Sequence, residues 1–112
     1  MKRTMNLLPQ VSFSILMALS LKPRHGYEIM QQVKEDSIGK IKLGPGSLYT
    51  TVKQLKEDNL IEDAENDDVR RHYYRLTKKG WQRLNAELMY FDKTLKIAKA
   101  RNVFEALVGV LK

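Results

Sequence analysis

Apolar residues recur every three or four positions in three segments of the first half of the chain, and this spacing predicts three helices. They are expected over residues 11–21, 26–36 and 45–58. Residues 22–24 form a turn between the first two helices, because Pro23 interrupts the pattern there. Residues 38–43 alternate apolar and basic side chains, which predicts a short strand or an extended link before the third helix.

The third predicted helix has one buried face and one exposed face. It begins at Pro45, because the missing N–H of proline has no intrahelical partner in the first turn anyway. Leu48, Val52 and Leu55 follow the spacing of a buried stripe. The outward face is therefore polar and able to form hydrogen bonds, and it carries Ser47, Tyr49, Thr50, Lys53 and Gln54.

Two short segments with a period of two follow this helix and predict a β-hairpin over residues 60–64 and 70–76. Asn and Asp residues at 66–68 supply the turn between them. Burial of an aromatic ring is favourable, so Tyr74 is assigned to the core together with Leu76. The opposite face of the second strand then carries Arg71, Tyr73 and Arg75.

A long helix is predicted from residue 78 to about residue 101, with Thr77 as its N-cap. Its apolar positions form a near-heptad seam, which consists of Trp81, Leu84, Leu88, Phe91, Leu95, Ala98 and Asn102. A chain of this size has too little core of its own to cover such a seam, which favours a homodimer. The alternative is that the seam packs on the first helix of the same chain. The apolar residues at 103–111 extend this surface and either contact a partner or fold back.

The size and composition fit one domain and argue against an enzyme. The chain has 112 residues, no Cys and only two His, so disulfides and thiolate metal sites are excluded. His25 is expected to start the second helix and His72 to lie in a strand, and neither has a partner at catalytic or ligand spacing. The apolar run at residues 11–21 is about half the ~20 residues that a membrane span needs. We therefore expect a cytoplasmic protein with no metal and no cofactor.

Charge is distributed unevenly along the chain. Residues 57–68 hold seven acidic and no basic side chains, whereas the segments before and after them carry net charges of +6 and +8. The second basic segment begins abruptly with Arg70 and Arg71. Such a cluster is a candidate contact for a polyanion, and the alternative is an ordinary solvated surface.

Three helices followed by a hairpin are the elements of a winged helix-turn-helix, in which the third helix enters the major groove of DNA. Three motifs carry a closer resemblance: HGYEI at residues 25–29, LGPGSLY at 43–49 and RRHYYRLTKKG at 70–80. In this order they resemble the PadR family of bacterial transcriptional regulators, over roughly residues 15–80. The single long C-terminal helix is similar to that of the short subfamily, whose members are dimers.

The resemblance implies a mainly α fold with a small β-hairpin. Residues 1–76 are then a winged helix-turn-helix domain and residues 77–112 a dimerisation helix. It also implies a homodimeric repressor that binds a pseudo-palindromic site on double-stranded DNA in the bacterial nucleoid. A small molecule, often a phenolic compound or a drug, changes its occupancy. Two other functions fit the residues alone, namely non-specific architectural DNA binding and a protein-interaction module.

The candidate DNA contacts follow from the motifs and from the polar face of the third helix. Phenols, hydroxyls and guanidiniums bind phosphates, and a lysine reaches either a phosphate or a guanine edge. The expected contacts are Ser47, Tyr49, Thr50, Lys53, Arg70, Arg71 and Tyr73. The expected dimer contacts are Leu84, Leu88, Phe91, Leu95 and Ala98. Phe91 and Trp81 are the candidates for contact with an aromatic effector.

Two positions depart from the family pattern. Ser47 stands where the family often has Thr, and the tip of the hairpin at residues 65–68 is short and acidic. Because phosphates repel carboxylates, we do not expect this tip to insert deeply into a groove.

Overall fold

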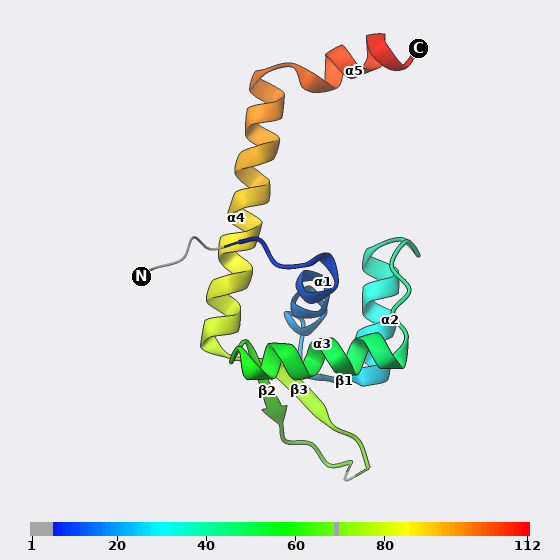
Figure 1. Cartoon of the computed structure of the whole chain (residues 1–112), viewed down its shortest axis with the longest axis vertical. Coiled ribbons are helices and arrows are strands. Elements are labelled where there is room, and N and C mark those ends of the chain that lie inside the picture. The colour runs from blue at the N-terminus through cyan, green and yellow to red at the C-terminus, as the bar shows by residue number, and fades with distance from the viewer. Residues whose placement is uncertain (1–5, 69) are drawn as a thin grey trace.

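The computed structural model describes residues 6–68 and 70–112 (Figure 1). Within these residues the elements are α1 (Gln10–Leu19), β1 (Arg24–His25), α2 (Gly26–Asp36), α3 (Pro45–Glu57), β2 (Ile61–Ala64), β3 (Tyr73–Leu76), α4 (Lys78–Ala100) and α5 (Val103–Leu111). The domain predicted over residues 1–76 includes the first five residues and Val69, which lie outside the described residues. The mainly α, winged helix-turn-helix fold is confirmed.

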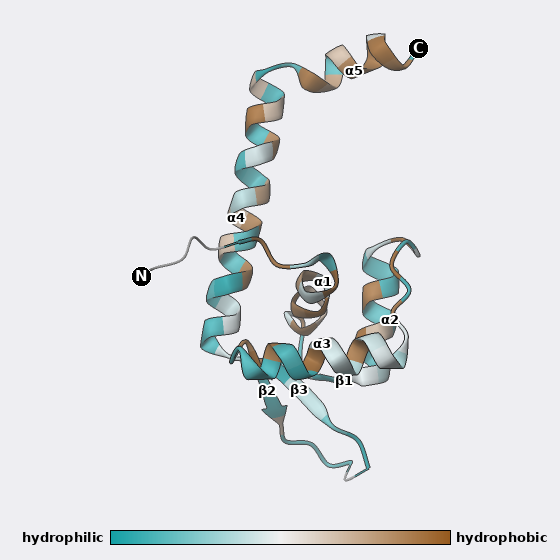
Figure 2. Cartoon of the chain, in the orientation of Figure 1, coloured by the Kyte–Doolittle hydropathy of each residue, from teal (hydrophilic) through white to brown (hydrophobic). Residues whose placement is uncertain are grey.

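The core surrounds α1, which contacts α2, α3, β3 and α4. The side chains of Ile15 and Leu16 in α1 are fully buried, and Figure 2 shows α1 between α4 and α2, with α3 below it. The stripe predicted on α3 is confirmed, because Leu48, Val52 and Leu55 are all buried. The opposite face of α3 therefore remains free for contacts with another molecule.

The sheet has three strands in the order β1-β3-β2, so the prediction of a two-stranded hairpin was incomplete. β1 pairs with β3 in antiparallel register, with Arg24 opposite Tyr74 and His25 opposite Tyr73. Residues 22–24 had been predicted as a turn, yet two residues are enough for a strand when a neighbouring strand supplies the hydrogen-bond partners. Through this pairing, the start of α2 is attached to the hairpin.

One predicted strand is shorter than expected, and for residues 38–43 the structure shows the second of the two predicted alternatives, an extended link, which follows a turn. β3 begins at Tyr73, and residues 70–72, including His72, belong to the connection between β2 and β3. Residues 38–43 continue from α2 as a turn and an extended link. Ile38 there has a φ of 55°, and the amide of Gly39 donates to the carbonyl of Lys34 at 2.8 Å, so the chain leaves α2 through a left-handed helix end.

The start of α4 is fastened to the end of α3. Thr77 is the predicted N-cap: its hydroxyl accepts from the amide of Gly80 at 2.9 Å and donates to the carbonyl of Asn59 at 2.6 Å. The amide of Thr77 donates to the carbonyl of Leu60 at 3.1 Å. The backbone of α4 passes so close to this carbonyl that a Cβ on Gly80 would overlap its oxygen. These contacts fix the direction in which α4 leaves the domain.

Beyond its first turns, α4 extends away from the domain as a free-standing helix (Figure 1). Leu84 is only 3% exposed and lies in the core of the chain itself, so this seam residue, which was predicted as a dimer contact, is not available to a partner. The seam ends at Asn102, whose φ of 55° breaks the helix and turns α5 sideways. α5 is strongly hydrophobic and has no buried residue (Figure 2). Among the described residues, no helix combines the length and apolar character needed to cross a membrane.

Candidate nucleic-acid interface

A cavity of about 470 Å³ lies where the start of α2, the first turn of α3 and the wing loop meet. We use "wing loop" for the connection between β2 and β3, residues 65–72, of which Val69 is not described. The cavity is lined by His25, Gly26, Tyr27, Tyr49, Arg70, Arg71 and His72. Two guanidiniums, two imidazoles and two phenols supply hydrogen-bond donors, which suits this cavity to an anion.

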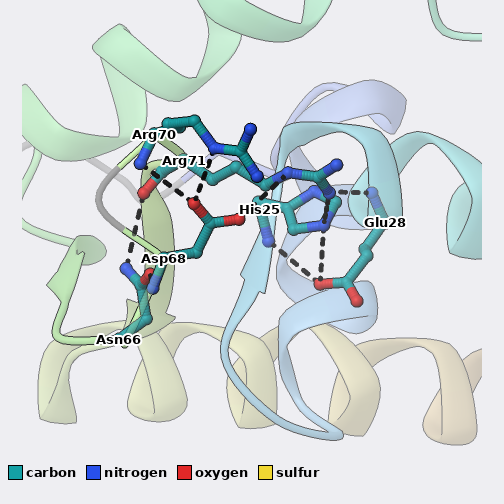
Figure 3. Close-up of polar contacts among 6 residues, drawn as sticks. All are labelled: His25, Glu28, Asn66, Asp68, Arg70 and Arg71. Carbon is teal, nitrogen blue, oxygen red and sulfur yellow. Dashed lines mark hydrogen bonds and ion pairs between the residues drawn. The ribbon is translucent and has the colours of Figure 1, made fainter.

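His25 connects α2 to the wing loop (Figure 3). As the N-cap of α2, it donates its amide to the Glu28 carboxylate at 3.2 Å, and its Nδ1 faces the Glu28 amide at 3.4 Å. Its Nε2 lies 2.7 Å from Nη1 of Arg71, 46 residues further along the chain. Arginine can only donate, so in the neutral ring Nε2 accepts from Arg71 in one tautomer, and Nδ1 accepts from the Glu28 amide in the other. His25 thereby orients Arg71 toward the cavity, and its predicted place at the start of α2 is confirmed.

Arg70 and Arg71 are also close to a carboxylate of their own loop (Figure 3). Asp68 lies 3.5 Å from Nε of Arg70 and 3.4 Å from Nε of Arg71, and it accepts the amide of Arg70 at 3.0 Å. Asn66 accepts the amide of Asp68 at 2.6 Å and donates to the carbonyl of Arg71 at 3.4 Å. Hydrogen bonds and ion pairs between its own polar side chains therefore stabilise the wing loop. They hold both guanidiniums next to the same carboxylate.

Tyr49 belongs to the same cavity because α2 and α3 approach each other closely. A Cβ built on Gly26 would lie 2.5 Å from the Tyr49 hydroxyl and 2.8 Å from Leu48 Cδ2. Only glycine leaves room for the phenol at this point. Tyr49 is half exposed and reaches the cavity from the N-terminal part of α3.

The remaining predicted contacts lie around this cavity. Lys53 lines a neighbouring groove together with Tyr49, and Ser47 and Thr50 line a shallow groove along the other side of α3. Tyr73 differs from the others, because it is partly buried and packs edge-on against His25 with ring centroids 5.1 Å apart. The structure therefore brings Tyr49, Arg70 and Arg71 into one site and gives Tyr73 a supporting position.

Two cations next to this site are paired with carboxylates of the acidic segment. Lys56 lies 3.0 Å from Asp63, and Arg75 lies 2.9 Å from Glu62. Tyr74 is buried as predicted, and burial raises the pKa of its phenol above 10.0, with smaller contributions from Tyr49 and Asp63. The acidic segment thus neutralises part of the basic surface that surrounds the cavity.

Sequence reasoning did not find four residues of the cavity. The residues that line it without having been predicted as site residues are His25, Gly26, Tyr27 and His72. His25 was expected only to start the second helix, where the structure shows it in a capping box with Glu28. The contact of His25 with Arg71 depends on the pairing of β1 with β3, which leaves no signal in the local sequence.

The two candidate effector residues lie apart on α4. They are separated by ten positions, which is about 15 Å along a helix. Both are partly exposed, and the Phe91 ring packs edge-on against Phe13 of α1 with centroids 5.3 Å apart. Trp81 and Phe91 therefore do not share one site within a single chain.

Residues 15–86 match the family described as "Transcriptional regulator PadR-like family". The chain belongs to this PadR-like family. The match begins in α1 and ends in α4, so it includes all the elements that form the cavity. Members of the family are transcription regulators rather than enzymes, and this chain is accordingly a DNA-binding transcriptional regulator.

The chain is also similar to individual proteins and solved structures, one of which is described as a PadR family regulator. A PadR family transcription regulator from Clostridium difficile R20291 is 26% identical, with a TM-score of 0.71 over 82% of this chain and 97% of that one. RosR of H. salinarum is also 26% identical, with a TM-score of 0.69 over 91% of each chain. "Uncharacterized protein X" of Lysinibacillus sphaericus is 32% identical over 71 residues, which are 60% of this chain and 65% of that relative.

Proposed function

We propose that this PadR-like protein is a homodimeric, sequence-specific repressor that a small molecule releases from its operator. The observation that carries the proposal is the cavity between α3 and the wing loop, in which Tyr49, Arg70 and Arg71 converge. A phosphate bound by these donors fixes the orientation of the protein on DNA without reading its sequence. The polar face of α3 then lies against the neighbouring groove, where Ser47, Thr50 and Lys53 are in reach of bases and backbone.

The exposed apolar surface of α4 and α5 supports a dimer. Leu88, Leu95 and Phe104 are each about half exposed, and α5 contributes further apolar side chains with no cover. Exposed apolar side chains in this number are typical of a site of protein association. In our proposal, residues 77–112 join two DNA-binding domains so that two α3 helices lie about 34 Å apart, one helical turn of DNA. Leu88, Phe91, Leu95 and Ala98 are the proposed contacts.

The effector in this proposal is a small aromatic molecule bound next to the dimer seam. Phe91 supports the idea because its ring joins α4 to α1 through Phe13, so a ligand that displaces it changes the angle between these helices. Trp81 reports binding through its fluorescence, since it is the single tryptophan in the chain. Phenolic compounds should quench Trp81, and the Phe91→Ala variant should lose the effect. Quenching that survives Phe91→Ala counts against this site.

The repressor proposal is tested by selection from genomic DNA of the bacterial host, where we propose that the protein acts in the cytoplasm on nucleoid DNA. The purified protein is mixed with fragmented DNA and competitor at physiological salt, and the retained fragments are sequenced. A few enriched fragments that share an inverted repeat support a specific repressor. Retention without enrichment contradicts it and favours architectural binding, and no retention by effector-free protein favours a protein-interaction module.

A further inference from the structure

We propose that Asp68 competes with DNA phosphates for Arg70 and Arg71, and that it thereby limits the affinity of the protein for DNA of arbitrary sequence. The inference rests on the proposed phosphate-binding role of the two arginines. The inference assigns a function to one residue of the acidic segment. By its charge alone, that segment would only repel DNA. Asp68 becomes a determinant of DNA affinity that contacts no base.

The geometry of the wing loop is that of a filled anion site. The Oδ1 atom of Asp68 lies 3.5 Å from Nε of Arg70, and Oδ2 lies 3.4 Å from Nε of Arg71. The Asp68 side chain is 31% exposed, whereas those of Arg70 and Arg71 are 85% and 52% exposed. The carboxylate therefore lies inward, between the two arginines, and the arginines remain open to the phosphate that we propose they bind.

Hydrogen bonds hold the carboxylate in this position. Oδ1 also accepts the amide of Arg70 at 3.0 Å, and the amide of Asp68 is bonded to Asn66 at 2.6 Å. Arg71 is fixed from its other side by His25 at 2.7 Å. Because both partners are held by the loop, Asp68 and the arginines stay close together, and an incoming phosphate meets a carboxylate that already faces the same guanidiniums.

A phosphodiester and a carboxylate each carry one negative charge, so they compete for the same cations and repel each other. For two unit charges about 4 Å apart in water, the attraction between carboxylate and guanidinium that the phosphate must replace corresponds to about a five-fold change in affinity. Binding to DNA of arbitrary sequence depends essentially on phosphate contacts. The competition with Asp68 therefore lowers the affinity for such DNA by its full amount. Weak non-specific binding matters because a genome offers very many competing sites.

The Asp68→Asn substitution removes the charge and keeps the loop. The Asn oxygen still accepts the Arg70 amide, as asparagine does in turns of this kind. Asp92→Asn is the matched control, because it makes the same chemical change at an exposed residue of α4 that pairs only with Lys96 in the described structure. Both substitutions raise the net charge of the chain from +7 to +8. Asp68→Ser keeps a hydroxyl acceptor and replaces Asn if Asn alters thermal unfolding.

Binding to a fluorescein-labelled duplex of mixed sequence is measured by anisotropy over a series of NaCl concentrations. Asp68→Asn should bind about five-fold more tightly than the unmodified protein at low salt, and the gain should shrink as salt screens it. Asp92→Asn should change the affinity less than two-fold. In the background of Arg70→Ala with Arg71→Ala, Asp68→Asn should have no effect, because the proposed competition acts through these two arginines.

The outcomes separate this inference from the proposed function. Unchanged or weaker binding by Asp68→Asn overturns the competition but leaves the repressor proposal intact, provided that the double arginine variant binds weakly. An equal gain from Asp92→Asn, or a gain that persists without the arginines, also overturns it, because net charge then explains the effect. Full DNA binding by the double arginine variant overturns the proposed phosphate contact and the competition together.

Discussion

The Gly80→Ala substitution tests whether α4 is fixed to the DNA-binding domain. In an ordinary helix this change is stabilising, because alanine is the better helix former by about 1 kcal/mol. Here a Cβ would overlap the carbonyl oxygen of Leu60 and would lie 3.0 Å from its carbonyl carbon and 3.4 Å from Leu76 Cδ2. The same oxygen accepts the Thr77 amide. The methyl group can therefore enter only if α4 moves away from the sheet.

The size of the effect follows from three opposing contributions. Overpacking of a close contact costs about 1–3 kcal/mol. Loss or lengthening of the hydrogen bond from Thr77 to Leu60 costs about 0.5–1.5 kcal/mol. The gain in helix propensity offsets about 1 kcal/mol of this. We therefore expect Gly80→Ala to lower the free energy of unfolding by about 2 kcal/mol.

The assay is urea unfolding followed by circular dichroism, at one fixed protein concentration because the proposed dimer makes stability depend on concentration. Gly109→Ala is the matched control, since Gly109 lies within α5 and a Cβ there meets nothing within 4 Å. We expect this control to be as stable as the unmodified protein or up to about 1 kcal/mol more stable. If Gly80→Ala is equally stable, the junction between α4 and the domain yields easily and our reasoning about it is wrong.

Three further substitutions test separate parts of the structure. Ile38→Gly should raise the free energy of unfolding by about 1 kcal/mol in urea, because a β-branched residue is strained at a φ of 55° and this one is 87% exposed; a loss of stability contradicts this. Tyr74→Phe should reduce the loss of stability that thermal unfolding detects above pH ~10: the folded pKa is raised, so the phenol favours folding below that pH and less so as pH rises. If Tyr74→Phe loses as much thermal stability above pH ~10 as the unmodified protein, this prediction is wrong. Leu95→Asp should weaken the dimer at least ten-fold in sedimentation equilibrium, while circular dichroism stays unchanged; an unchanged dimer excludes this face.

The helices that carry local signals were predicted well. α2 has the predicted bounds, and α3 begins at Pro45 as predicted, because helix caps and apolar periodicity both act within a few residues. Thr77 is the N-cap of α4 for the same reason. The buried side of the hairpin, with Tyr74, also follows from a local alternation.

Features that depend on distant partners could not be predicted in this way. β1 exists only because β3 lies beside it, and the cavity depends on a contact between His25 and Arg71 across 46 residues. The seam on α4 was predicted to start before Leu84, but periodicity cannot separate residues that pack inside the chain from those left for a partner. The end of α4 at Ala100 agrees with the prediction of about residue 101, whereas the left-handed φ of Asn102 and the separate helix α5 were not predicted.

The salt dependence of DNA binding by the Arg70→Ala, Arg71→Ala double variant tests the central claim most directly. Each arginine that neutralises a phosphate contributes about 0.9 to the slope of log affinity against log salt. Loss of both should lower the slope by about 1.8 for each protomer, and weaken binding at least ten-fold at low salt, with thermal unfolding unchanged. An affinity and a slope equal to those of the unmodified protein would contradict the proposal that this cavity holds the phosphates of DNA.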